Sequence, residues 1–138
     1  MHALNRFHHH YPFALTALCV ALIWYLCLFR PPHISMLDGI SGFDKVVHSC
    51  MYLGTCSVFW LESKLCQRPK RTALKLLLGV VAPIVMSGII ELAQAYLTTY
   101  RSGEWADLAA NSAGVVIAWG ISPLIKRIIK ISIDEETL

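Results

Sequence analysis

The sequence predicts an all-α fold, a polytopic membrane bundle of four transmembrane helices with both termini in the cytoplasm. The chain has 138 residues, of which 56% are hydrophobic and 15% are charged. Its mean hydropathy of +0.55 is too high for an ordinary soluble domain. The apolar residues are gathered into four blocks, and at ~1.5 Å per residue a helix of roughly 18–20 residues crosses the ~30 Å hydrocarbon core. The chain therefore predicts a single domain over residues 1–138.

The first two blocks predict spans at residues 12–29 and 46–61. Residues 12–29 carry no charge over 18 positions. Because this run ends without a small-x-small cleavage site, we expect it to remain as an anchor and not to be removed as a signal peptide. Residues 46–61 give 16 positions with a single histidine. This second block is the weakest prediction, since a run of that length also suits a buried helix of a soluble protein.

The last two blocks predict spans at residues 73–97 and 107–125. Pro83 interrupts the third span and is predicted to kink it, because proline cannot donate a backbone hydrogen bond. In the fourth span a small residue recurs every four positions, which favours close approach of a neighbouring helix. This ridge consists of Ala106, Ala110, Gly114 and Ala118.

The basic residues predict the orientation of these spans. Nine of the 12 Lys and Arg residues fall on the side that holds both termini and the loop between spans two and three. The positive-inside rule places that side in the cytoplasm. The loops at residues 30–45 and 98–106 are then expected on the outer side. The basic loop sets topology in this interpretation, and we expect no nucleic-acid partner.

Polar residues are predicted to meet near the outer ends of three spans. Asp44 and His48 lie one turn apart, Glu91 and Gln94 share a stripe, and so do Asp107 and Asn111. Glu91 is six residues before Leu97, so it lies about 9 Å inside the outer boundary. A carboxylate inside a membrane span costs roughly 2.5–3.5 kcal/mol at the helix centre, and such residues usually serve function. The predicted ligand-binding set is Asp44, Lys45, His48, Glu91, Gln94, Arg101, Asp107 and Asn111.

Structural roles remain open for several members of this set. Asp44 and Asp107 stand near the starts of predicted helices, where a carboxylate suits the positive end of the helix dipole. Glu91 is equally able to bridge to Arg101 or to His48 without any ligand.

The ordered motifs D-K-x-x-H, E-x-x-Q and R-x(5)-D-x(3)-N-x-x-G resemble those of the VanZ-like family of small membrane proteins. They cover residues 44–114 of this chain. The resemblance implies an integral protein of a bacterial plasma (inner) membrane with a role in the cell envelope. It also implies a link to low-level resistance against the glycopeptide antibiotic teicoplanin.

Three functions fit these observations. The first is the binding or handling of an anionic membrane lipid or lipid-linked envelope precursor, with Lys45 and Arg101 as cations. The second is a membrane-embedded hydrolase or metal-dependent enzyme, with His48, Glu91 and Asp107 as the catalytic candidates. The third is a non-catalytic assembly partner whose polar groups only bind the helices together. No cofactor is expected, and no metal site is predicted with assurance.

Overall fold

The structure is a computed structural model that describes residues 11–29, 42–98 and 104–136, with the backbone alone at 126 and 128–136. Within these ranges most of the chain is helical, and no strand is present. Helix α2 spans Ala14–Leu28, α3 spans Phe43–Leu65 and α6 spans Trp105–Glu136. Between α3 and α6 lies one continuous helical segment made of α4 (Thr72–Leu76), the π-helical turn η2 (Leu77–Val81) and α5 (Ala82–Leu97). The predicted all-α fold is confirmed.

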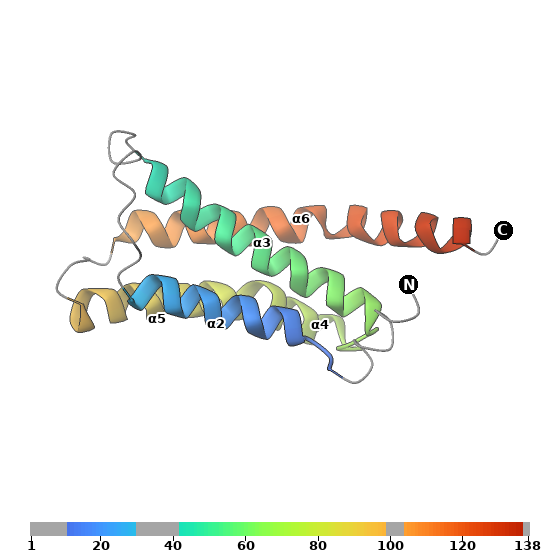
Figure 1. Ribbon diagram of the computed structural model, residues 1–138, viewed down its shortest axis with the longest axis horizontal. Helices are drawn as coiled ribbons and strands as arrows, with labels where there is room; N and C mark the ends of the chain where they lie inside the picture. Colours follow the sequence, from blue (N-terminus) through green and yellow to red (C-terminus); the bar gives the residue numbers. More distant parts are fainter. Residues whose placement is uncertain (1–10, 30–41, 99–103, 137–138) are drawn as a thin grey trace.

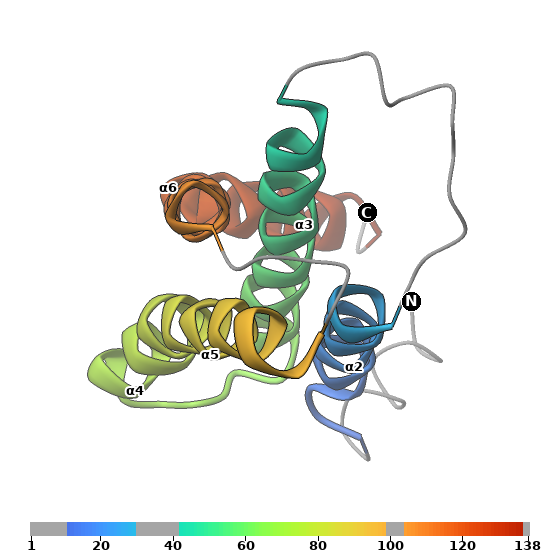
Figure 2. The same cartoon turned by 90° about the vertical axis from the view of Figure 1, so that its left-hand side faces the viewer.

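The four long helical segments run up and down alternately along one axis (Figure 1). Consequently α2 begins, and α6 ends, at the same end of the bundle, whereas α3 and α6 both start at the opposite end. Helix α3 lies obliquely between α6 on one side and α2 and α5 on the other (Figure 2). Its most extensive packing is against α6.

A narrow apolar core lies where α3 meets the other helices. It consists of Ile23, Cys27, Tyr52, Cys56, Phe59, Trp60, Ile90, Val115 and Ala118. Most other large apolar side chains point outwards, and Leu18, Ile89 and Val116 are each at least half exposed. A surface of this kind is costly in water and suits a hydrocarbon surrounding.

Two helical segments are long and apolar enough to cross a membrane, Thr72–Leu97 and Trp105–Ile125. Only 22% and 28% of their most apolar windows are buried, so most of each apolar surface faces outwards. Helix α2 is apolar but has 15 residues, and its length of about 22 Å is less than the ~30 Å core. The number of spans and the side of the termini therefore stay predictions.

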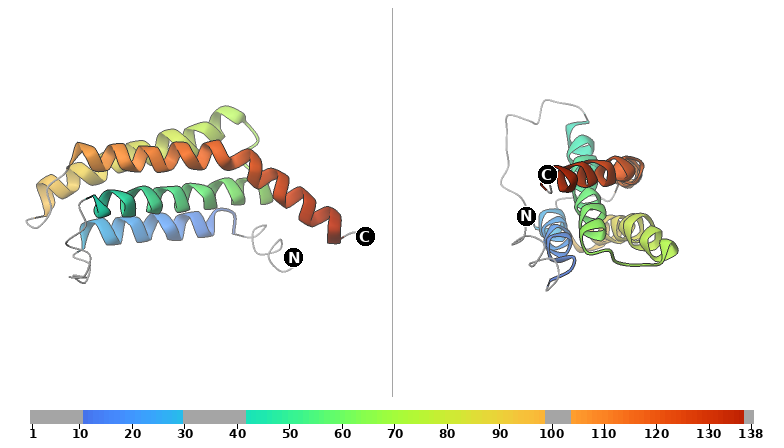
Figure 3. Two further views of the ribbon diagram at one scale, coloured as in Figure 1. Left: turned by 90° about the horizontal axis from the view of Figure 1, so that it is seen from above. Right: turned by 90° about the vertical axis from the view of Figure 1, so that its right-hand side faces the viewer.

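Two helices differ from the lengths that the sequence predicts. Helix α3 extends beyond the predicted span 46–61 in both directions, because flanking polar residues continue its backbone hydrogen bonding. Helix α6 does not end near residue 125 but continues to Glu136. It bends in its C-terminal half (Figure 3), and Pro123 provides the cause, since its ring removes one backbone hydrogen bond.

The predicted effect of Pro83 takes the form of a π-helical turn. Pro83 cannot donate to the carbonyl of Gly79, and a regular helix would press its ring against that group. The chain widens here instead, so that Ala82 N–H donates to the carbonyl of Leu77, five residues earlier. A Cβ on Gly79 would lie 2.6 Å from a ring carbon of Phe59, so α3 packs directly on this turn.

Candidate functional site

The predicted polar residues lie at the end of the bundle where α3 and α6 begin and α5 ends. They divide into three groups, each between a different pair of helices. The structure brings Lys45, Glu104 and Asp107 together between α3 and α6. It places Glu91 between α5 and α6, and Gln94 between α5 and α2. Arg101, which the sequence predicts to bind ligand, lies outside the described residues.

The first group is an ionic cluster at the start of α3 and α6. Lys45 Nζ donates to Glu104 Oε2 at 2.9 Å and to Asp107 Oδ1 at 3.1 Å. These hydrogen bonds raise the pKa of Lys45 above its ordinary value, and the bond to Glu104 has the larger effect. The ammonium therefore stays charged. One turn along α3, His48 Nε2 lies 3.7 Å from Asp44 Oδ2. His48 and Asp107 are buried, whereas Asp44 is exposed.

The second group surrounds the Glu91 carboxylate. Glu91 Oε2 accepts a hydrogen bond of 3.0 Å from the backbone N–H of Glu104, the residue that precedes α6. Helix N-termini leave several N–H groups without an intrahelical partner, so Glu91 supplies one of the missing acceptors. One turn deeper, Asn111 Nδ2 donates to Ser87 Oγ at 2.8 Å. The polar stripes of α5 and α6 therefore face each other.

The third group joins α5 to α2. Gln94 is 1% exposed, and its Nε2 donates to the carbonyl oxygen of Cys27 at 3.0 Å. Cys27 lies in the last turn of α2, where carbonyl groups lack intrahelical donors. The predicted ligand-binding Gln94 thus completes the C-terminus of a neighbouring helix.

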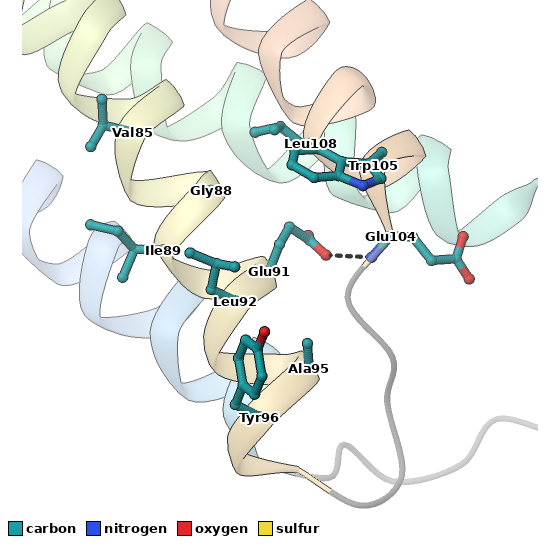
Figure 4. A pocket seen from close by; sticks show the side chains of 10 residues that line it. All are labelled: Val85, Gly88, Ile89, Glu91, Leu92, Ala95, Tyr96, Glu104, Trp105 and Leu108. Atoms are coloured by element: carbon teal, nitrogen blue, oxygen red, sulfur yellow. Dashed lines mark hydrogen bonds between the residues drawn. The ribbon is translucent and has the colours of Figure 1, made fainter.

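A groove of about 410 Å³ opens between α5 and α6 beside Glu91. Figure 4 shows the Glu91 side chain pointing from α5 towards the start of α6, with Trp105 and Leu108 above it. Gly88 contributes room, because a Cβ built there meets no atom within 4 Å. We call this cavity the α5–α6 groove, and its lining is Val85, Gly88, Ile89, Glu91, Leu92, Ala95, Tyr96, Glu104, Trp105 and Leu108.

Although the sequence predicts that the polar residues of three spans meet, they do not all line the α5–α6 groove. Its lining includes Glu91, but Asp44, His48 and Asn111 are not part of it. The reason is helical geometry. Asp107 and Asn111 lie on the face of α6 that packs against α3 and α5, whereas Trp105 and Leu108 lie on the adjoining face that forms the groove.

Glu62 is a fully buried carboxylate that is not among the residues predicted from the sequence. It lies near the end of α3, at the opposite end of the bundle from Glu91. It accepts hydrogen bonds from Leu15 N at 3.2 Å, Thr16 N at 2.9 Å and Thr16 Oγ1 at 2.6 Å. These are donors in the first turn of α2, so Glu62 caps that helix. In the sequence Glu62 merely follows an apolar block, and its partners are more than 40 residues away.

Comparison with known proteins identifies a family. A family model described as VanZ/LLP1 matches residues 5–126, which is most of the chain. This confirms the resemblance that the ordered motifs predict. No curated protein and no solved structure matches the chain.

Proposed function

The chain belongs to the VanZ/LLP1 family, and from this premise we propose that it binds or handles an anionic membrane lipid or lipid-linked envelope precursor. The observation that carries the proposal is the α5–α6 groove, an apolar channel with a carboxylate in its wall. The proposal includes a four-span protein of a bacterial plasma membrane with its polar groups near the outer surface. It also includes a role in glycopeptide resistance of the teicoplanin type.

Membrane embedding is supported by the outward-facing apolar side chains of α5 and α6 and by the distribution of basic residues. Both termini and the loop before α4 would face the cytoplasm, as the positive-inside rule predicts. The alternating course of the helices agrees with this, because it places the start of α2 and the end of α6 at one end (Figure 1).

A reporter fusion tests the topology. Alkaline phosphatase fused after Gly103 is expected to be active, because the loop before α6 would lie outside the cytoplasm. The same enzyme fused after Arg71 is the matched control and is expected to be inactive. Activity of the Arg71 fusion with an inactive Gly103 fusion would invert the orientation and with it the location of the polar groups.

The α5–α6 groove suits an aliphatic chain because most of its lining is apolar. Val85, Ile89 and Leu92 line one wall from α5, and Leu108 lines the other from α6. Trp105 and Tyr96, both more than 80% exposed, stand at the polar end, where amphipathic rings favour the headgroup layer. A lipid would lay its chain along the apolar walls, with its polar part at the end of the groove where Trp105 and Tyr96 stand.

Filling the groove is expected to weaken lipid binding without unfolding the protein. In Gly88→Leu the new side chain enters open space, because nothing lies within 4 Å of a Cβ there. Purified protein in nanodiscs that contain a photoactivatable phosphatidylglycerol would be irradiated, and the labelled peptides mapped by mass spectrometry. We expect labelling of the groove residues to fall about tenfold, which corresponds to roughly 1.4 kcal/mol.

Gly120→Leu is the matched control, since Gly120 lies on α6 outside the groove and also meets nothing within 4 Å of a Cβ. It is expected to leave labelling unchanged. Equal labelling of the two variants, with both folded, would contradict the lipid proposal. It would favour the assembly function, which the hydrogen bonds of Glu91 to Glu104 N and of Gln94 to Cys27 O support.

A further inference from the structure

Three ligating side chains converge at the start of α3 and α6, outside the α5–α6 groove. One ligand atom from each of Asp44, His48 and Asp107 lies within 4.8 Å of the others. His48 is 3% exposed and Asp107 is 5% exposed, so two of the three are fixed by packing. The side chain of Asp44 is 54% exposed, so it is the most accessible of the three.

We propose that these three residues hold a divalent cation of the transition series, with Zn²⁺ as the probe ion. Zinc binds histidine nitrogen and carboxylate oxygen at about 2.0–2.2 Å, so two ligands of one ion lie at most about 4.4 Å apart. The His48–Asp44 distance of 3.7 Å already satisfies this limit. The other separations are at most 4.8 Å, so side-chain shifts of about half an ångström or less would bring the whole set within this limit.

Two neighbours support a cation at this place. Lys45 Nζ already binds Asp107 Oδ1 at 3.1 Å, which shows that a positive charge is accommodated beside this carboxylate. Its side chain is 38% exposed, so it can swing outwards when a metal enters. Asn111 lies one turn deeper on α6, is 1% exposed, and its Oδ1 has no hydrogen-bond donor within the part of the chain described. An amide oxygen of this kind is suited to accept a hydrogen bond from a metal-bound water.

The cation would also reduce the repulsion between the carboxylates at this end of the bundle and an anionic lipid. This consequence rests on the proposed function. Among the described residues, four carboxylates lie at this end of the bundle, those of Asp44, Glu91, Glu104 and Asp107. Each of these carboxylates would repel an anionic headgroup that came near it. A divalent ion at the Asp44–His48–Asp107 site would reduce that negative charge and offer an open coordination position to a phosphate oxygen.

Metal binding is measured on the full chain in detergent, purified without a histidine tag. Because a run of three histidines is able to bind metal by itself, His8, His9 and His10 are replaced by glutamine in every sample. Titration with Zn²⁺ against a chromophoric chelator is expected to show one ion per chain. His48→Gln and Asp107→Asn should each weaken that binding at least about tenfold, since each removes one ligand. Circular dichroism checks that the variants remain helical.

One further variant sharpens the test. Lys45→Met removes the competing ammonium and should leave Zn²⁺ affinity equal or higher. The proposal is overturned if no stoichiometric Zn²⁺ binds to the parent or to Lys45→Met, or if folded His48→Gln and Asp107→Asn bind as tightly as the parent. Binding that persists while lipid labelling fails would reject the proposed function alone.

Discussion

Replacing Glu62 by alanine is expected to destabilise the bundle by about 3 kcal/mol. The carboxylate is fully buried and accepts three hydrogen bonds from the first turn of α2. Hydrogen bonds to a charged group contribute roughly 1.5–3 kcal/mol each, and loss of a helix cap typically costs about 1 kcal/mol. Because Thr16 is partly buried, its freed N–H gains little from water in return. Unfolding by SDS in mixed micelles, followed by circular dichroism, measures the change.

Glu104→Gln is the matched control for Glu62→Ala. It also neutralises a carboxylate, but the side chain of Glu104 is 52% exposed and binds the half-exposed Lys45. Exposed ion pairs contribute little, so a change below about 0.5 kcal/mol is expected. Limited proteolysis adds a local measurement, because Glu62→Ala should make the start of α2 more easily cleaved. Equal stability of Glu62→Ala and the parent protein would contradict this prediction. It would show that water accepts the hydrogen bonds of the first turn of α2 as well as Glu62 does.

The second large effect is expected for Gly114→Ala, which should destabilise the protein by about 2 kcal/mol. A Cβ at Gly114 would overlap the backbone carbonyl oxygen of Ser49 and lie 3.0 Å from Leu53 N. Both are backbone atoms of α3, so the helices must separate to admit a methyl group. Overpacking of this kind costs typically 1–3 kcal/mol, although alanine itself favours a helix over glycine by about 1 kcal/mol. The same SDS titration gives the net change.

Gly120→Ala, on the same helix, isolates the propensity effect. Nothing lies within 4 Å of a Cβ there, so this substitution should stabilise the protein by up to about 1 kcal/mol. Opposite signs for the two variants would demonstrate close backbone contact between α3 and α6. If Gly114→Ala stabilises the protein as much as Gly120→Ala does, then α3 and α6 are not in close backbone contact at Gly114.

Much of the fold follows from the sequence because membrane helices and their small-residue contacts depend on local patterns. The four apolar blocks each correspond to a helix, and the ridge of small residues correctly indicates a close contact at Gly114 and Ala118. Helix limits were less predictable. Polar residues flank the apolar block in α3 and follow it in α6, and hydropathy does not register that the backbone stays helical there.

The arrangement within the candidate site depended on contacts that no local pattern reveals. The stripe of α6 predicts that Asn111 faces a neighbouring helix, and Asn111 does donate a hydrogen bond to Ser87 of α5. Glu91 and Gln94, by contrast, bind backbone groups of Glu104 and Cys27, and any residue type at those positions offers the same N–H or carbonyl group. The α5–α6 groove likewise arises from the separation of two helices near Gly88, which only coordinates show.

The dependence of α2 on later segments bears on how the protein is made. Its first turn is completed by Glu62 and its last turn by Gln94, residues that the ribosome adds some 46 and 67 positions afterwards. A newly synthesised α2 that entered the bilayer alone would carry unsatisfied polar groups at both ends of a helix about 22 Å long. Under the proposed topology, such a segment would be retained by the insertion machinery until its partners emerge, and chains truncated before Gln94 would be degraded.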